Sequence, residues 1–273
     1  MQAGCKGAGI GSLSGAKIGI ILEGNAERRI KMQVVIADNE SVFYERSACR
    51  IAEIIRNNPM AKIGLSTGRT TKGIHEALVE IYKKEPFDCS RLKVFGIDEI
   101  TNMSRECKAS CYYILLHEVV NPLGIPHENF IMPDPMAEDL QEECRIFEEI
   151  ITADGGPDFI FLGLGENGHL GFNQPGTSFG QTAWLSWMDD SLDERLRREN
   201  NISDDVKMGG LTLGIKNLMH SKCLVMAANG NNKAEMAQKM IEGAVTEEVP
   251  ASILQLHPQC EVILDPAAAK YLA

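Results

Sequence analysis

The sequence predicts an α/β fold: a three-layer αβα sandwich with a mainly parallel, Rossmann-like sheet. Two patterns carry this prediction. Short apolar segments alternate along the chain with longer segments whose apolar residues recur at helical spacing. The apolar segments are also nearly continuous, as in 158–164, where polar residues do not alternate with apolar ones. Such runs are typical of parallel strands that helices cover on both faces.

The expected elements begin at Met32. The segment 41–58 predicts a helix, because Phe43, Ile51 and Ile55 fall on one helical face and Pro59 ends the segment. Similar patterns predict the other helices, so that the expected set is 41–58, 70–84, 104–120, 136–152, 233–242 and 267–272. Strands are expected at 33–37, 62–65, 91–97, 158–164, 222–227 and 261–264.

Residues 1–31 are expected to form an N-terminal extension outside the core, and residues 32–273 a single domain. The start of the extension is rich in Gly, Ser and Ala, and its apolar stretch at 18–22 is too short for the core of a signal peptide. No repeat, low-complexity segment or linker divides the sequence from residue 32 onward.

The charge balance limits the partners. The formal net charge is −11, from 38 acidic and 27 basic residues. A field of this sign repels polyphosphate backbones, so no nucleic-acid partner is expected. The apolar runs are too short to span a bilayer, so no membrane partner is expected either. An anionic small molecule would have to be held by a local positive site.

The eight cysteines predict neither disulfides nor a metal site. They form no CxxC pair, and no cysteine–histidine cluster has zinc spacing. A chain of this length can bury a core without covalent cross-links. We therefore expect reduced thiols and a cytoplasmic protein. Cys107 and Cys111 share one face of an expected helix, which packing alone explains.

Ligands of such folds bind at the carboxyl ends of the strands, and the first loop there suits a phosphate. It follows the strand expected at 62–65 and precedes a helix, a place where Gly68 lets the backbone approach an anion closely. The hydroxyl groups of Ser66, Thr67 and Thr70 add donors. A simpler reading stays open, in which Thr67 or Thr70 merely caps the helix.

The second loop carries two adjacent acids, Asp98 and Glu99, at the end of an apolar strand. A carboxylate fixed and partly desolvated at a strand end makes an effective general base. Spacing alone leaves the alternative that these acids only mark the point where the strand meets solvent.

The third loop, 163–176, contains a literal G-x-G-x-x-G after a strand. In a dinucleotide site the third Gly opens a helix, whereas Pro175 and Gly176 interrupt any helix here. No dinucleotide cofactor is therefore expected. The segment is better interpreted as a long loop that presents Asn167, His169 and Gln174 at the edge of the sheet.

At this point the chain resembles the glucosamine-6-phosphate deaminase/isomerase family, which includes galactosamine-6-phosphate deaminases and, more distantly, 6-phosphogluconolactonases. Six blocks in order carry the resemblance: STGRTT at 66–71, FGIDE at 95–99, GLGENGHLGFNQPG at 163–176, LTLGIKNL at 211–218, GNNKAEMA at 230–237 and PASILQLHP at 250–258. The resemblance implies a fold of the sugar-phosphate isomerase/deaminase type. It also implies conversion of an amino-sugar 6-phosphate to a ketohexose 6-phosphate and ammonia, without a cofactor.

The resemblance also implies roles for individual residues. Asp98 matches the base that moves a proton between C2 and C1 of the opened sugar, and His169 matches the histidine that opens the pyranose ring. Lys233 matches a phosphate-binding lysine, and Arg198, or its neighbour Arg197, falls near a phosphate-binding arginine. The phosphate loop corresponds to Ser66, Thr67, Gly68, Arg69 and Thr70.

Two departures from the family pattern concern the histidine. Asn167 stands where glucosamine-6-phosphate deaminases have Asp, and Gln174 stands where they have Glu. A carboxylate raises the basicity of a neighbouring imidazole, whereas an amide can only orient it. A third departure concerns regulation, because the segment that aligns with the basic allosteric residues of the family reads Trp184 to Ser186.

The sequence favours an amino-sugar-phosphate isomerase/deaminase whose partner is a hexosamine 6-phosphate. Two alternatives stay open: a sugar-phosphate-binding protein with weak or no deaminase activity, and a lactonase that hydrolyses a 6-phosphosugar lactone. The FNQPG sequence at 172–176 resembles the deaminases rather than the lactonases. The choice between glucosamine and galactosamine, and between a monomer and a homo-oligomer, is open at this stage.

Overall fold

A computed structural model describes residues 16–18, 32–188, 193–194, 197–198, 203 and 208–273. Its largest element is a sheet of eight strands in the order β1-β2-β11-β10-β7-β3-β4-β6. All of these strands run parallel except the edge strand β1, which pairs antiparallel with β2. The bounds are β1 Ala16–Ile18, β2 Gln33–Ala37, β3 Lys62–Leu65, β4 Lys93–Gly96, β6 Phe130–Ile131, β7 Phe159–Gly163, β10 Leu224–Ala228 and β11 Cys260–Leu264.

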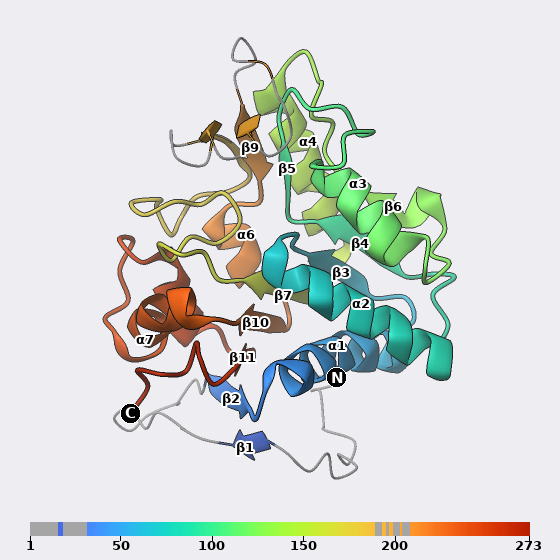
Figure 1. Cartoon of the computed structure of the whole chain (residues 1–273). Coiled ribbons are helices and arrows are strands. Elements are labelled where there is room, and N and C mark those ends of the chain that lie inside the picture. Colours follow the sequence, from blue (N-terminus) through green and yellow to red (C-terminus); the bar gives the residue numbers. More distant parts are fainter. Residues whose placement is uncertain (1–15, 19–31, 189–192, 195–196, 199–202, 204–207) are drawn as a thin grey trace.

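Helices cover both faces of this sheet, so the predicted three-layer arrangement is confirmed (Figure 1). The helices on one face are α1 (Glu40–Asn57), α2 (Arg69–Lys84) and α3 (Cys111–Leu115), which continues as a π-helix at Leu116–Val120. Those on the other are α4 (Leu140–Thr152), α6 (Ile215–Met219) and α7 (Ala234–Glu242).

The central strands are apolar because each one faces both layers. In β7, Phe159 and Phe161 pack under α1 and α2, whereas Ile160 and Leu162 belong to the hydrophobic cluster on the opposite face. Side chains of a strand alternate between faces, so a strand covered on both sides needs apolar residues at every position. This is the physical basis of the continuous apolar runs in the sequence.

A second, smaller sheet was not predicted. It contains β5 (Asp98–Ile100), β8 (Trp184–Trp187) and β9 (Gly209–Thr212), paired antiparallel in the order β5-β9-β8. These strands are short, and β9 begins with two glycines, which carry no strand signal. The chain passes from β4 of the main sheet almost directly into β5 of the small sheet, so Asp98 lies just outside the main sheet.

Three predicted helices need correction. Residues 267–272 form turns, because the Asp265 carboxylate accepts the backbone N–H of Ala268 and a six-residue helix gains little from cooperativity. The helix expected at 104–120 begins at Cys111, where the Ser110 side chain accepts the N–H of Tyr113. Similarly, α4 starts at Leu140 because Asp139 caps it.

The N-terminal extension lies mostly outside the described residues. Its described part, Ala16–Ile18, pairs with β2 at the edge of the main sheet. The boundary at residue 32 stays a prediction. Met32 itself is buried in the core.

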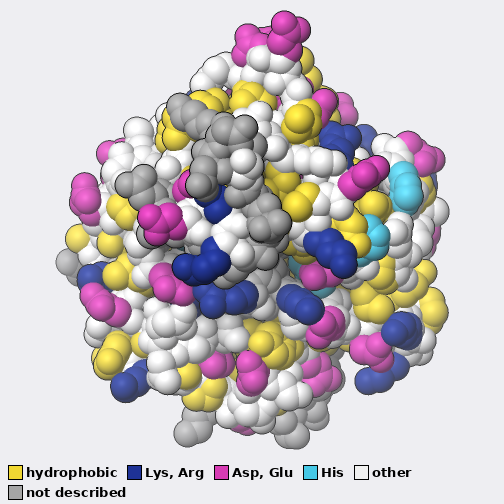
Figure 2. Space-filling view, turned by 45° about the horizontal axis from the view of Figure 1, so that its top comes forward, with side chains coloured by type: hydrophobic (Ala, Val, Ile, Leu, Met, Phe, Trp, Pro, Cys, Tyr) yellow, Lys and Arg dark blue, Asp and Glu magenta, His cyan; other side chains and the backbone are white. Residues whose placement is uncertain are grey.

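Among the described residues, no helix is long and apolar enough to cross a membrane. The cysteines of the described chain are free thiols. On the face shown in Figure 2, acidic and basic side chains are interspersed, and hydrophobic side chains occur in small groups.

Candidate active site

The order of the sheet brings the three predicted loops together. Strands β10, β7, β3 and β4 are consecutive neighbours and run parallel, so their carboxyl ends lie side by side. The segments that follow them are 229–233, 164–176, 66–68 and 97–99. Residues far apart in the sequence therefore meet at one edge of the sheet, the place where ligands bind in this class of fold.

The loop after β3 leaves a free anion cradle. Gly68 caps α2 without a side chain, at φ +145°, and a Cβ added to it would meet nothing within 4 Å. The space beside Gly68 is thus open, next to the first turn of α2, whose backbone N–H groups have no acceptor within the helix and carry the positive end of its dipole. Beside them, the Ser66 hydroxyl is buried and has no hydrogen-bond partner among the described residues. These donors together suit a phosphate.

The loop after β10 adjoins this cradle. The Thr70 hydroxyl donates to Asn229 Oδ1 at 2.7 Å, which ties the two loops together. Gly230, at φ +91°, turns the chain, and its N–H donates to Asp265. The half-buried Lys233 follows three residues later and ends this turn just before α7. A phosphate in the cradle would thus lie beside a loop that carries a cation.

Glu166 also joins these two loops. Its carboxylate accepts a hydrogen bond from Asn232 Nδ2 at 2.8 Å and lies 3.5 Å from Arg69 Nη2. Both members of this ion pair are largely exposed, so its net contribution to stability is small. The sequence offered no local signal for Asn229, which directly follows β10, or for Glu166, which lies three residues after the end of β7.

The two adjacent acids after β4 have different environments. The fully buried Glu99 carboxylate accepts the backbone N–H groups of Cys111 and Tyr112 at 2.9 and 2.7 Å, and so caps α3. Asp98 is 8% exposed, and within the described chain its carboxylate accepts a hydrogen bond from the Cys111 thiol, at 3.6 Å. Glu99 is therefore committed to structure, which leaves Asp98 for chemistry.

The surroundings of Asp98 make it a base near neutral pH. Burial and the neighbouring Glu99 charge raise the pKa of Asp98 from 3.8 to about 7, and the hydrogen bond from Cys111 opposes this shift. A general base is most effective when its pKa lies near the working pH. Burial also raises the pKa of Glu99, against the hydrogen bonds that it accepts.

The loop after β7 holds His169 through two amides. Asn167 Oδ1 lies 2.7 Å from His169 Nδ1, and Asn167 Nδ2 donates to Gln174 Oε1 at 2.9 Å. The backbone N–H of His169 also donates to Asn167 Oδ1, at 3.2 Å. Because a backbone N–H can only donate, the amide oxygen must face His169. In the neutral ring the proton then lies on Nδ1, and Nε2 carries the lone pair.

Glycines allow this loop to approach Asp98. A Cβ on Gly171, at φ +57°, would lie 3.1 Å from Asp98 Oδ2 and 2.9 Å from Thr212 Oγ1. A Cβ on Gly165 would lie within 2.5 Å of the His169 ring. A Cβ at Gly165 would clash with the ring, and one at Gly171 would be both strained by its φ and crowded by Thr212 and Asp98. One glycine of the motif that resembles a dinucleotide site, Gly165, thus makes room for the His169 ring, and Gly171, outside that motif, lets the loop approach the base.

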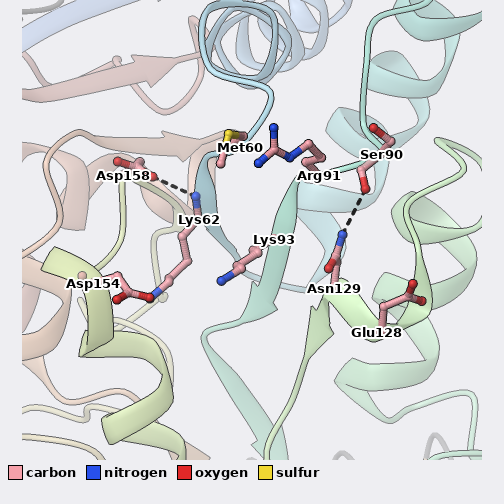
Figure 3. Close-up of a pocket in the computed structure, with 10 residues that line it drawn as sticks. Met60, Lys62, Ser90, Arg91, Lys93, Glu128, Asn129, Asp154 and Asp158 are labelled. Carbon is pink, nitrogen blue, oxygen red and sulfur yellow. Dashed lines mark hydrogen bonds between the residues drawn. The ribbon is translucent and has the colours of Figure 1, made fainter.

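A separate cavity lies at the opposite edge of the sheet (Figure 3). It has a volume of about 560 Å³ and lies at the amino ends of β3 and β4, where Lys62 and Lys93 begin these strands. Lys62 Nζ donates to the carbonyl groups of Ile150, Ile151 and Ala153, which end α4. The Asp158 carboxylate is paired with Lys222 at 2.7 Å. Lys62 and Asp158 thus have partners within the protein, and no residue of the three predicted loops lines the cavity, so it is not the candidate active site.

The predicted arginines are not placed as clearly. Arg198 is exposed, and Arg197 is paired with Asp193. Most of their chain neighbours lie outside the described residues, so a role of either arginine in phosphate binding stays a prediction. Within the described chain, no group of three or more His, Cys, Asp or Glu side chains is arranged to hold a metal ion.

Known proteins of similar sequence and structure identify the family of this chain. The family model described as glucosamine-6-phosphate isomerases/6-phosphogluconolactonase matches residues 40–263. A glucosamine-6-phosphate deaminase of Clostridium botulinum (strain Loch Maree / Type A3) is 34% identical over 241 residues, which cover 88% of this chain and 99% of the relative. One of Thermoanaerobacter pseudethanolicus is also 34% identical, over 88% of this chain and 95% of the relative.

Solved structures share the fold. A monomeric glucosamine-6-phosphate deaminase superposes with a TM-score of 0.83 at 29% identity, and the match covers 88% of this chain and 99% of that one. A 6-phosphogluconolactonase from Trypanosoma cruzi superposes with a TM-score of 0.73 at 19% identity, over 91% and 100% of the two chains. The lactonase comparison shows the fold alone. With the family match over most of its length, the chain belongs to the glucosamine-6-phosphate isomerase/6-phosphogluconolactonase family.

Proposed function

We propose that the protein is a hexosamine-6-phosphate isomerase/deaminase that converts glucosamine 6-phosphate to fructose 6-phosphate and ammonia. The observation that carries the proposal is the position of Asp98, a buried carboxylate with a pKa of about 7, between an anion cradle and the His169 loop. The names of the relatives support glucosamine over its C4 epimer, galactosamine. The free thiols of the described chain suit a reducing compartment and support a cytoplasmic location.

Binding begins with the phosphate in this proposal. The backbone N–H groups at the start of α2 and the Ser66 hydroxyl group donate hydrogen bonds to it, with Lys233 as the cation. Thr67 and Thr70, whose hydroxyl groups donate to Cys111 and Asn229, shape the loop around the phosphate. Fixing the phosphate also fixes the sugar carbon chain, because the ester links it to C6. Positioning of this kind converts the proton transfers at C1 and C2 into intramolecular steps.

His169 opens the pyranose ring. Its Nε2 takes the proton of the C1 hydroxyl group, and the ring oxygen receives a proton as the C1–O5 bond breaks, which gives the open-chain aldehyde. The imidazolium formed in this step is supported by Asn167, which keeps the proton on Nδ1. Since neither Asn167 nor Gln174 carries a negative charge, we expect slower ring opening than with carboxylates at these positions.

Asp98 moves the proton. Its ionised carboxylate removes the hydrogen on C2 of the open-chain sugar in its C2 ammonium form, the electron pair forms the C1–C2 double bond, and the C1 oxygen takes a proton from the ammonium group, which gives a neutral enolamine. Asp98 then returns its proton to C1, which completes the C1 hydroxymethyl group and leaves a C2 iminium group. Water adds to C2, the C–N bond breaks, and ammonia departs as the C2 ketone forms. General base catalysis of this kind is typically worth about 10²–10⁴-fold in rate.

An ammonia-release assay tests the proposal. Glucosamine 6-phosphate, galactosamine 6-phosphate and unphosphorylated glucosamine are offered to the full chain and to Asp98→Asn. We expect release from glucosamine 6-phosphate, little from the unphosphorylated sugar, and a loss of about 10²–10⁴-fold in the variant. Because Asn167 and Gln174 are uncharged, a sugar-phosphate-binding protein without deaminase activity is the second candidate. Binding of the 6-phosphates without ammonia release from either epimer would establish that candidate instead.

A further inference from the structure

Cys111 contacts both the phosphate loop and the base. It is the first residue of α3 and 4% exposed. Its Sγ lies 3.2 Å from Thr67 Oγ1, in the loop after β3, and 3.6 Å from Asp98 Oδ1, at the start of β5. One side chain thus bridges two of the segments that meet at the carboxyl edge of the sheet.

We propose that Cys111 is a positioning residue, whose thiol holds the Asp98 carboxylate in the orientation needed to take the proton from C2. The inference rests on the proposed deaminase function and extends it. It assigns no reaction to the sulfur itself. The thiol acts only through Asp98.

The environment of Cys111 differs from that of the other buried cysteines. Four of the five buried cysteines in the described chain lie in hydrophobic clusters, where packing explains them; they are Cys89, Cys144, Cys223 and Cys260. Cys111 belongs to none of these clusters, and the contacts of its sulfur are with the oxygens of Thr67 and Asp98. The sequence-based explanation, packing on a helix face, therefore does not account for this residue.

The direction of the two hydrogen bonds follows from their chemistry. An ionised carboxylate can only accept, so the thiol hydrogen points to Asp98 Oδ1. The sulfur then accepts the Thr67 hydroxyl hydrogen, which anchors it. Burial and the neighbouring Glu99 and Asp98 charges raise the pKa of the Cys111 thiol well above its usual value, so the donor hydrogen is retained at working pH.

This hydrogen bond leaves one oxygen of Asp98 available to the substrate. Oδ1 is held by the thiol, whereas Oδ2 faces Gly171 in the loop that carries His169. Without the thiol, the carboxylate would lose a donor to its charged form and a constraint on its side-chain rotation. The first loss raises the pKa of Asp98, and the second lowers the fraction of molecules with a productive geometry.

The test compares Cys111→Ala, Cys111→Ser and the unaltered full chain. For Cys111→Ala we expect kcat to fall about 10-fold with KM changed by less than about 3-fold, and the acid limb of the kcat–pH profile to move up by about one unit. Cys111→Ser restores a donor, and should return the acid limb toward its original position. Cys144→Ala is the matched control, because it removes a buried thiol from a hydrophobic cluster and should leave the profile unchanged.

A second readout does not depend on turnover. The titration of Asp98 is followed by carbon-13 NMR of the labelled carboxyl group, assigned by its loss in Asp98→Asn. A pKa for Asp98 that is higher in Cys111→Ala than in Cys111→Ser supports the positioning role, whether or not the protein releases ammonia. A failure to release ammonia contradicts only the proposed function. Identical Asp98 titrations and identical acid limbs in Cys111→Ala and the unaltered chain would overturn the inference.

Discussion

Asp98 and Glu99 are consecutive acids in buried surroundings, and the number of donors around each separates their roles. Glu99 accepts hydrogen bonds from the start of α3 and holds a helix in place. Asp98 accepts a hydrogen bond from the Cys111 thiol, a weak donor, so its ionised form is poorly stabilised. A poorly stabilised carboxylate costs folding free energy and supplies a base. The proposed chemistry and the stability of the protein are therefore in conflict at this residue.

Asp98→Asn should stabilise the folded protein, and more at pH 8 than at pH 5. Between pH 3.8 and about 7 the folded protein keeps a proton on Asp98 that the unfolded chain has released, so stability falls as pH rises through this window. Asparagine carries no such proton. The gain in free energy of unfolding should grow with pH to at most about 4 kcal/mol, measured by urea unfolding.

The exposed Asp88 gives the matched control for this prediction. Hydrogen bonds from Ser90 lower the pKa of Asp88, so this carboxyl group exchanges protons on unfolding only below about pH 4, and Asp88→Asn should change the free energy of unfolding equally at pH 5 and pH 8. A gain for Asp98→Asn that is the same at pH 5 and pH 8 would contradict the raised pKa of Asp98.

Gln174→Glu should raise turnover. Gln174 is linked to His169 through Asn167. A carboxylate at position 174 would accept the same hydrogen bond from the Asn167 amide and place a negative charge behind the imidazolium that forms during ring opening. Gln174→Ala removes the acceptor and should lower turnover. Both are measured as kcat with glucosamine 6-phosphate. Equal kcat values for Gln, Glu and Ala at this position would show that the amide chain does not influence His169.

At the scale of elements, the site consists of loops that parallel strands place side by side. The cradle at the start of α2 and the turn before α7 come from segments about 160 residues apart, and the Thr70–Asn229 hydrogen bond joins them. The helix supplies partial positive charge, and the turn supplies the formal charge of Lys233. A protein with a net charge of −11 can hold an anion at such a local site.

Lys233→Ala should weaken the binding of a 6-phosphosugar by about one to two decades, since a hydrogen bond to a charged group contributes about 1.5–3 kcal/mol. Calorimetry with glucose 6-phosphate, which carries the phosphate but no amine, measures binding without turnover. Lys239→Ala is the control, because Lys239 lies nearby in α7, the helix that follows Lys233, and pairs with Glu235 on the surface. If both variants bind as tightly as the unaltered chain, Lys233 does not hold the phosphate.

Much of this organisation could be predicted from the sequence. The central strands β3, β7 and β10 were predicted because strands buried on both faces must be apolar along their whole length. Motifs after β3, β4 and β7 indicated the loop at 66–70, Asp98 and His169. The small antiparallel sheet was not predicted, because it pairs short strands about 110 residues apart, one of which begins with two glycines.

Other features of the site depend on contacts that the linear sequence does not contain. The sequence could not show which of the neighbouring acids Asp98 and Glu99 is the base. The hydrogen bonds that commit Glu99 to a structural role come from residues 110–112. The position of Cys111 between Thr67 and Asp98 likewise requires the neighbouring strands to be in place. The sequence suggested orienting amides at Asn167 and Gln174, and the order of their contacts emerges only in the folded loop.

At the scale of the whole molecule, the small sheet supports the loop of His169. Trp184 Nε1 donates to Asn173 Oδ1, and the Ser186 hydroxyl donates to the carbonyl of Phe172, both at 2.9 Å. The segment that aligns with the allosteric residues of the family thus contributes structural contacts here and supplies no cation at these positions. A regulator requires a second site with different affinities for two states.

We therefore expect no activation by N-acetylglucosamine 6-phosphate. Rate curves against glucosamine 6-phosphate, recorded with and without the acetylated sugar at a concentration too low to compete for the active site, should superimpose. A clear increase in rate at low substrate would reveal an allosteric site elsewhere in the molecule.

The central claim is that Asp98 transfers the C2 proton of a bound hexosamine 6-phosphate. Exchange in heavy water measures this step directly, with NMR of the recovered glucosamine 6-phosphate at C2 and of the product at C1. The unaltered protein should place solvent deuterium at both positions and release ammonia, and Asp98→Asn should exchange about 10²–10⁴-fold more slowly while still binding the sugar phosphate. Exchange at the same rate in Asp98→Asn, or no exchange and no ammonia with the unaltered protein, would contradict the claim.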